Sequence, residues 1–403
     1  MELFWLEHKK LWRKKIVKIC VLLCFVYCVI FGSILLFQWF GFGSSDDYTS
    51  AFGNNFDGYT VIKDSQEYAL SFGGELTDET LQQIVSDYQQ MEADGMEEEL
   101  EKTDWKIVNS WLGTLYPELR DTGNYKTMIS YVDPDKLTGF YERRQQVLDE
   151  FLEVSGQVGA EKEYLHQIER KVEKPFHYEW VEGWSTLLGS MVADLGVVMA
   201  LFLGIVLSSL FAGEWHDNTS TLVLTTRNGW GKIALAKILT GLAFTVELFA
   251  LLAVSSVISQ LFFMGTAGWD MPIQNIKLIA VAPMNMLQAE IYEYAFVLLG
   301  AIGFAGIVMF ISAAVKNNVL TLLLSLAVVY GPMMIAEYLP YEMQKALDLI
   351  PLVGSSTDIF RTNTFRIFGK LIWSPYLLIT IPVLIGILCM PFAIRSWSRR
   401  MKA

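Results

Sequence analysis

The stretch TLLGSMVADLGVVMALFLGIVLSSLFAG, from Thr186 to Gly213, decides the fold of this chain. It contains a single ionisable side chain, Asp194. About 20 apolar residues in a helix cross the ~30 Å hydrocarbon core of a bilayer, and a helix satisfies its own backbone hydrogen bonds inside lipid. The stretch therefore predicts a transmembrane helix.

Five further stretches have the length and apolar character of membrane spans. They are Ile19–Phe40, Ile233–Met264, Tyr294–Val315, Val319–Ala336 and Leu371–Ile394. The composition agrees, because 53% of the 403 residues are hydrophobic, only 18% are charged, and the mean hydropathy is +0.35. These values are typical of membrane proteins rather than soluble domains. We expect an all-α polytopic membrane protein with six transmembrane helices.

Most of the acidic residues lie in one long segment, residues 41–184, between the first two expected spans. The chain has 43 Asp and Glu against 31 Lys and Arg, a net charge of −12, which argues against a nucleic-acid partner. Helix starts are expected at Thr77, at Asp133-Pro134 and after Gly159. The segment is therefore predicted to be a large, mainly helical extracellular domain, followed by spans 2–6 in residues 185–403.

The sidedness follows from the basic residues, which mark cytoplasmic segments. They cluster in residues 1–18, around the loop between spans 2 and 3, and at the C-terminus. Both termini are thus expected in the cytoplasm, with the protein in the plasma membrane. The expected outer loop 340–370 fits this rule least well, because it also carries basic residues.

Residues 1–18 form an amphipathic pattern before the first span, residues 19–40. One helical face carries Phe4, Trp5, Leu11, Trp12 and Ile16, and the other carries Lys9, Lys10, Arg13 and Lys14. Such a helix can lie in the membrane interface on the cytoplasmic side, with its cations against lipid headgroups. The alternative is a basic flank that only sets the orientation of the first span.

The sequence lacks the motifs of the common catalytic and metal sites. The closest string to a phosphate-binding loop, TRNGWGK, lacks the first glycine at the required spacing, and no HExxH or GxSxG motif occurs. The four histidines are scattered. We expect no enzyme activity, no cofactor and no metal in this chain.

Two polar residues and one glycine pattern stand out within the expected spans. Asp194 and Glu247 are costly to expose to lipid, so we expect each to face protein or water. Each could belong to a polar patch in a translocation path or at a subunit contact, or could lie near an interface or bond a neighbouring helix. Gly300, Gly303 and Gly306 share a small-residue surface that favours close helix packing.

The loop between spans 2 and 3 carries a family resemblance. Its flanks and loop read FAGEWHDNTSTLVLTTRNGWGKIALAKIL, from Phe211 to Leu239. This resembles the ABC-2 type permeases, the transmembrane subunits of bacterial ATP-binding cassette exporters, with Asn218 where a glycine is usual. The matching residues are Glu214, Thr219, Leu222, Leu224, Thr225, Thr226 and Lys237. KPFHYEWVEGW (Lys174–Trp184) and FRIFGKLIW (Phe365–Trp373), the latter expected to open the sixth helix, are similar to clostridial-type members.

The resemblance implies a permease that dimerises with an identical or paralogous chain and binds two separate ATPase subunits, which would hold ATP and Mg²⁺. Residues 214–231 would be the segment coupling ATPase closure to the helices. Glu214 would end a helix, Thr219 would lie in the turn, Arg227 would lie at the tip, and Lys232 would follow the loop.

Three functions remain open at this point. The first is export or clearance of an amphipathic peptide, lipid-like antibiotic or related substrate. The second is extrusion of sodium or another cation, which intramembrane carboxylates would suit. The third is a surface receptor or sensor whose acidic domain binds cationic peptides, although the chain has little cytoplasmic mass for an output module.

Overall fold

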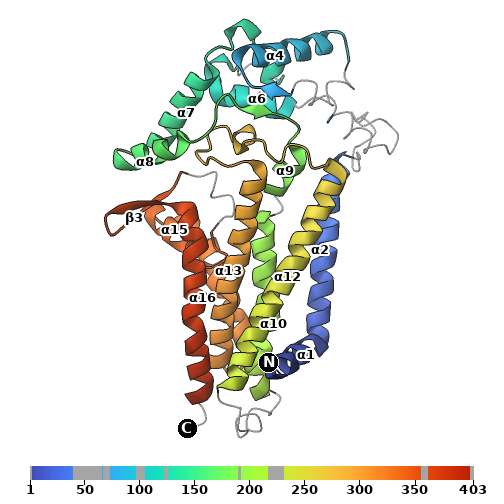
Figure 1. The fold of residues 1–403 in the computed structure, drawn as a ribbon, viewed down its shortest axis with the longest axis vertical. Coiled ribbons are helices and arrows are strands. Elements are labelled where there is room, and N and C mark those ends of the chain that lie inside the picture. The colour runs from blue at the N-terminus through green and yellow to red at the C-terminus, as the bar shows by residue number, and fades with distance from the viewer. Residues whose placement is uncertain are drawn as a thin grey trace.

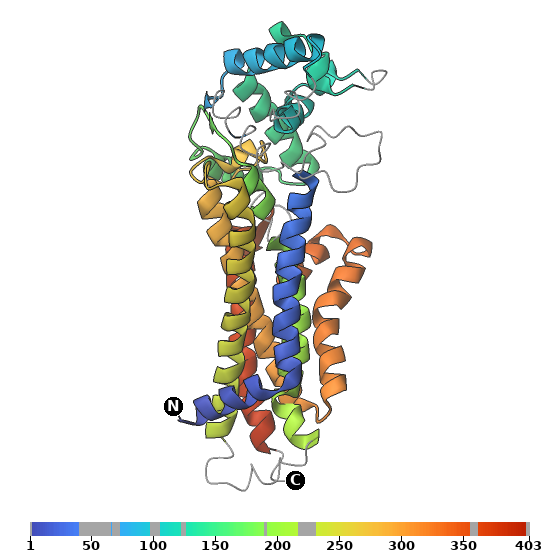
Figure 2. The same ribbon diagram turned by 90° about the vertical axis from the view of Figure 1, so that its right-hand side faces the viewer.

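A computed structural model describes residues 2–39, 66, 73–96, 105–121, 126–188, 192–216, 231–354 and 362–399, with the backbone alone for 31–39, 105–106, 192–194, 216 and 399. Within these ranges the chain is mostly helical, and its long helices form an elongated bundle (Figure 1). Both termini lie at one end of the bundle, which we call the termini end. A group of shorter helices built from residues 73–188, which we call the cap, lies at the other end (Figure 2).

Within the described residues, six long helices form the bundle. They are α2 (Lys15–Trp39), α10 (Val192–His216), α12 (Lys232–Met264), α13 (Met286–Ala314), α14 (Asn318–Ile335) and α16 (Ser374–Arg399). Among the described residues, five helices are long and apolar enough to cross a membrane, namely α10, α12, α13, α14 and α16. This is the pattern of a multi-pass membrane protein. The expected first span lies in α2, and the side chains of its second half lie outside the described residues, so the count of six stays a prediction.

The shorter elements cap and connect these helices. They are α1 (Glu2–Arg13), α4 (Asp78–Ala93), α6 (Trp105–Leu115), α7 (Phe140–Val154), α8 (Ala160–Glu169), α9 (Glu182–Thr186), α15 (Tyr341–Leu347) and the 3₁₀ turns Pro117–Leu119, Met128–Ser130, Pro134–Lys136, Ile273–Asn275 and Ala336–Tyr338. Two small antiparallel sheets pair β1 (Gly74–Glu75) with β2 (His177–Tyr178), and β3 (Thr364–Ile367) with β4 (Lys370–Trp373).

Helix α13 lies at the centre of the bundle and packs closely on α16. A Cβ atom added to Gly303 would lie 2.3 Å from the carbonyl oxygen of Pro382, and one added to Gly306 would lie 2.5 Å from that of Gly386. The prediction of a small-residue contact in this helix is confirmed. The backbones approach because Gly303 and Gly306 on α13 and Gly386 on α16 carry no side chains.

The helix starts expected for the sixth span and at Asp133-Pro134 differ in the structure. The sixth span begins at Ser374 rather than Leu371, because FRIFGKLIW forms the β3–β4 hairpin instead of opening the helix. In the cap, Thr77 caps α4 as expected, but α7 begins at Phe140. The carboxylate of Asp78 accepts the backbone N–H groups of Gly139 and Phe140 at 2.7 and 2.9 Å, so a tertiary contact sets this helix end.

A buried arginine fastens the cap to the α12–α13 connection. Arg144 on α7 donates to Glu169 at 2.6 Å and to the carbonyl oxygens of Leu278 and Ala280 at 2.7 and 3.1 Å. Burial lowers the pKa of Arg144. Burial alone would raise the pKa of Glu169, but hydrogen bonds from Lys174 and Arg144 hold it below the ordinary value. The ionised pair is therefore favoured at neutral pH.

We expect Arg144→Met to destabilise the docked cap by about 3–5 kcal/mol, because it breaks a buried ion pair and removes the side-chain donor to the carbonyl oxygen of Leu278. Hydrogen exchange of the amides around Leu278 and limited proteolysis of the cap measure this loss. Arg170→Met is the matched control, since Arg170 is 69% exposed and 3.5 Å from Glu163. Such a surface pair contributes about 0–1 kcal/mol, and equal effects of the two substitutions would contradict the docking role.

Candidate functional site

The structure places two of the four predicted coupling residues. Glu214 lies in the last turn of α10 and is buried, whereas Lys232 opens α12 and is exposed. Thr219 and Arg227 lie in 217–230, outside the described residues. Of the predicted coupling segment 214–231, the structure therefore describes only the two ends, residues 214–216 and 231.

Glu214 belongs to a buried ion cluster at the termini end of the bundle. Its Oε1 accepts hydrogen bonds from Lys237 Nζ at 2.7 Å and from Lys10 Nζ at 2.6 Å. Lys237 also donates to Glu7 Oε2 at 2.9 Å and to the carbonyl oxygen of Leu210 at 3.0 Å. The three donors of the ammonium group therefore all have acceptors.

The cluster joins three helices that lie far apart in the sequence. Glu7 and Lys10 come from α1, Glu214 from α10, and Lys237 from α12. The side chains of Glu214 and Lys237 are only 4% and 2% exposed. Buried ions are tolerated where opposite charges and hydrogen bonds replace the lost water. The two helices that enter and leave the segment 217–230 are therefore fastened together beside that segment.

Helix α1 completes this arrangement. It lies across the termini end of the bundle (Figure 2), with Leu11 buried and Trp5 exposed. Lys14 Nζ donates to Ser209 Oγ of α10 at 3.0 Å. Two of the cations expected to face lipid headgroups, Lys10 and Lys14, thus have protein partners.

The two predicted intramembrane carboxylates have different outcomes. The side chain of Asp194 lies outside the described residues. Glu247 on α12 is 41% exposed and contacts α1, with His8 Nε2 at 3.1 Å and Trp12 Nε1 at 3.0 Å. Glu247 therefore joins two helices at the edge of the bundle rather than lining its interior.

A pair of buried carboxyl groups was missed in the sequence. Glu290 and Glu293 lie three residues apart on α13 and are 3% and 0% exposed. No described residue places a hydrogen-bond donor in good geometry on any of their four oxygen atoms. Beside them, the hydroxyl groups of Ser256 on α12 and Tyr294 are 2.7 Å apart.

The signal for this pair lay in the start of α13. The apolar run that predicts this span begins at Tyr294, so both acids lie outside it. Asn285 and Gln288 form a capping box, with Asn285 Oδ1 accepting from Gln288 N at 2.8 Å and Gln288 Oε1 accepting from Asn285 N at 3.2 Å. An Asn-x-x-Gln pattern marks a helix start, and it would have included both acids.

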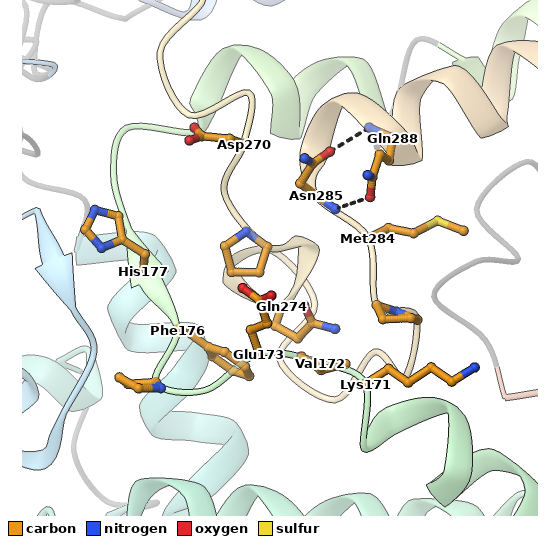
Figure 3. A pocket seen from close by; sticks show the side chains of 13 residues that line it. Lys171, Val172, Glu173, Phe176, His177, Asp270, Gln274, Met284, Asn285 and Gln288 are labelled. Carbon is orange, nitrogen blue, oxygen red and sulfur yellow. Dashed lines mark hydrogen bonds between the residues drawn. The ribbon is translucent and has the colours of Figure 1, made fainter.

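A cleft of about 370 Å³ lies where the cap meets the α12–α13 connection (Figure 3). One wall is residues 171–177 of the cap, and the other is residues 270–288. It was not expected from the sequence, because its walls are about a hundred residues apart along the chain.

We predict that Glu214→Gln and Lys237→Met each lower the free energy of unfolding by about 3–5 kcal/mol, since each leaves a buried partner with less counter-charge. The double variant is expected to lose about 1–3 kcal/mol less than the sum, because the two residues interact directly. Unfolding of the purified chain by titration with denaturing detergent measures the four proteins. Lys232→Met, at an exposed residue, is the control with an expected change within about 0.5 kcal/mol; additive losses would contradict the cluster.

Known proteins give no further guide to these sites. Comparison of the chain with protein-family models, with curated proteins and with solved structures finds no match. The family of the chain is therefore an expectation from its sequence, and its function has to be argued from the geometry above.

Proposed function

We propose that this chain is the permease subunit of an ATP-driven exporter, moving an amphipathic peptide, lipid-like antibiotic or related substrate. It would dimerise with an identical or paralogous chain in the bacterial plasma membrane, with both termini in the cytoplasm. Separate ATPase subunits would supply ATP hydrolysis with bound Mg²⁺. The resemblance at residues 211–239 motivates this proposal, and the buried cluster around Glu214 is the observation that carries it.

The cluster suits a coupling role because of where it lies. A partner that pushes on residues 217–230 acts on the ends of α10 and α12, and the Glu214–Lys237 ion pair fastens these ends at 2.7 Å. A push is then passed on as movement of a rigid unit rather than absorbed by separation of the helices. Glu7 and Lys10 add α1 to that unit.

The test measures ATP hydrolysis that co-purifies with the full-length chain from its own host in mild detergent. We expect Mg²⁺-dependent turnover, and we expect Glu214→Gln to lower turnover per mole of folded chain several-fold while the ATPase stays bound. The reason is that the substitution weakens the contact between α10 and α12 and changes no residue of the segment 217–230.

The matched control is Glu150→Gln, which removes one exposed carboxylate from the cap and is expected to leave turnover unchanged. A folded, monodisperse chain that retains no ATPase activity would contradict the permease proposal. Retained activity with the same turnover in Glu214→Gln would leave a permease but remove the coupling role of the cluster.

The buried Glu290 and Glu293 pair favours extrusion of sodium or another cation as a second candidate. Two carboxyl groups in an apolar interior need neutralisation by protons or by a bound cation. The hydroxyl groups of Ser256 and Tyr294 are further oxygen atoms beside the pair, and oxygen atoms are the ligands of hard cations.

We expect dicyclohexylcarbodiimide, an apolar reagent for protonated carboxyl groups, to label Glu290 or Glu293 in the full chain. Sodium is expected to suppress this labelling several-fold at constant pH and ionic strength, because a bound cation displaces the proton. Mass spectrometry of peptides from α13 locates and quantifies the adduct.

Two controls separate the outcomes. Glu247→Gln removes the exposed carboxylate on α12 and is expected to leave labelling unchanged, whereas Glu290→Gln with Glu293→Gln removes it. Labelling that responds to pH but not to sodium, lithium or potassium would contradict cation binding at the Glu290 and Glu293 pair.

A further inference from the structure

Hydrogen bonds fix the two walls of the cleft between the cap and the α12–α13 connection relative to each other. Asn275 Nδ2 donates to the carbonyl oxygen of His177 at 2.9 Å, which joins the two walls. Trp111 Nε1 donates to the carbonyl oxygen of Asn275 at 3.1 Å. Arg144 binds the carbonyl oxygens of Leu278 and Ala280 from the cap side. The walls are therefore positioned before any ligand arrives, which lowers the entropic cost of binding.

The connection itself is folded back on its own backbone. Ile273 N donates to the carbonyl oxygen of Met284 at 3.2 Å, and Met286 N donates to that of Met271 at 2.9 Å. These bonds place Gln274 at the turn of the connection, where it lines the cleft.

Gln274 carries an unsatisfied acceptor in this cleft. Its side chain is fully buried, and its amide nitrogen donates to the carbonyl oxygens of Ala280 and Ala282, both at 2.9 Å. These two bonds use both amide hydrogens and fix the orientation of the group. Its Oε1 has no donor among the described residues. A buried acceptor without a partner costs about 1–3 kcal/mol, which a ligand donor would recover.

Two carboxylates accompany this acceptor. Glu173 and Asp270 line the cleft, and no ion pair to either occurs in the described part of the chain. Figure 3 shows Glu173 beside Gln274 in the middle of the view, whereas Lys171 extends away from them and His177 lies near Asp270 on the other side. The capping box of α13 uses the side-chain oxygens of Asn285 and Gln288 as acceptors and leaves their NH₂ groups as donors. Around Gln274, the polar groups left for a ligand are acceptors, namely its own Oε1 and the carboxylate of Glu173.

The remainder of the lining is apolar. It consists of Val172, Pro175, Phe176, Pro272, Pro283 and Met284. A ligand that fits both parts carries a positive charge and an apolar surface side by side.

We propose that this cleft binds a cationic amphipathic ligand. Its ammonium or guanidinium group donates to Gln274 Oε1 and pairs with Glu173 beside it, and Asp270 on the other side of the cleft adds negative charge. Its apolar part packs on Pro272, Met284 and Phe176. The acidic segment 41–184 raises the local concentration of such ligands. The site does not depend on the permease proposal, because it serves a receptor equally well.

The test measures binding without nucleotide, on the full-length chain in nanodiscs of phosphatidylcholine. The probe is a fluorescein-labelled peptide of alternating leucine and lysine, followed by fluorescence polarisation. We expect Glu173→Gln with Asp270→Asn to weaken binding by about tenfold or more, since a hydrogen bond to a charged group contributes about 1.5–3 kcal/mol and 1.4 kcal/mol is tenfold. Both residues are exposed, so the variant is expected to fold.

The matched control removes the same charge elsewhere on the cap. Glu142→Gln with Glu150→Gln, both on exposed residues of α7, is expected to change affinity less than twofold. A peptide with glutamate in place of lysine is expected not to bind. If both double variants weaken peptide binding equally, the peptide is attracted by the charge of the cap as a whole, and the proposed site is overturned. Unchanged peptide binding in the cleft variant would overturn it too. Binding at the cleft in a chain that retains no ATPase would uphold this site while the permease proposal fails.

Discussion

An ionised side chain removed from water needs opposite charge and hydrogen bonds around it, and this requirement governs both ends of the molecule. At the cap end the buried ion is Arg144, and Glu169 and two carbonyl oxygens of the α12–α13 connection accept its hydrogen bonds. At the termini end the buried ion is Lys237, and Glu7, Glu214 and the carbonyl oxygen of Leu210 accept its hydrogen bonds. In each case the acceptors come from segments distant in sequence, so satisfying one cation fixes the relative positions of several elements.

The apolar middle of the bundle follows from a simpler rule, and the sequence predicts it well. Hydropathy alone locates α10, α12, α13, α14 and α16, because helices in lipid must bond internally and need a minimum length. The helix ends were harder to predict. The capping box at Asn285 starts α13 earlier than its apolar run does, and pairing of β3 with β4 delays α16. Hydrogen bonds of a capping box and of a strand pair set these helix starts, and hydropathy contains no information about such contacts.

The sites divide in the same way. Glu214 stands out in the sequence by a resemblance to the ABC-2 type pattern. However, Lys10, which pairs with Glu214, and Glu7, which pairs with Lys237, come from an N-terminal helix that was expected to face lipid. Arg144 carries no local signal, since an arginine on an amphipathic helix is normally solvated. Its role appears only when Leu278 and Ala280 are brought beside it. Long-range partners of this kind follow from the tertiary fold rather than from any local pattern.

Helix α13 connects the features that lie at opposite ends. Its first turn lines the cleft with Gln288, and its next turns carry Glu290 and Glu293. Gly303 and Gly306 then bring its backbone against α16. Near its last turn, Ser312 Oγ donates to the carbonyl oxygen of Ser208 at 2.7 Å and accepts from Phe211 N at 3.1 Å, within one turn of Glu214 on α10.

These contacts restrict how α13 can respond to a ligand. At Gly303 and Gly306 the backbone of α13 contacts that of α16 directly. No flexible side chain lies between them that could rearrange when α13 is displaced. A ligand that displaced the first turn at the cleft would therefore act on Ser312 and, through it, on α10. Because α10 is joined to α12 by the Glu214–Lys237 ion pair, the same packing would link a binding event at the cleft to the termini end.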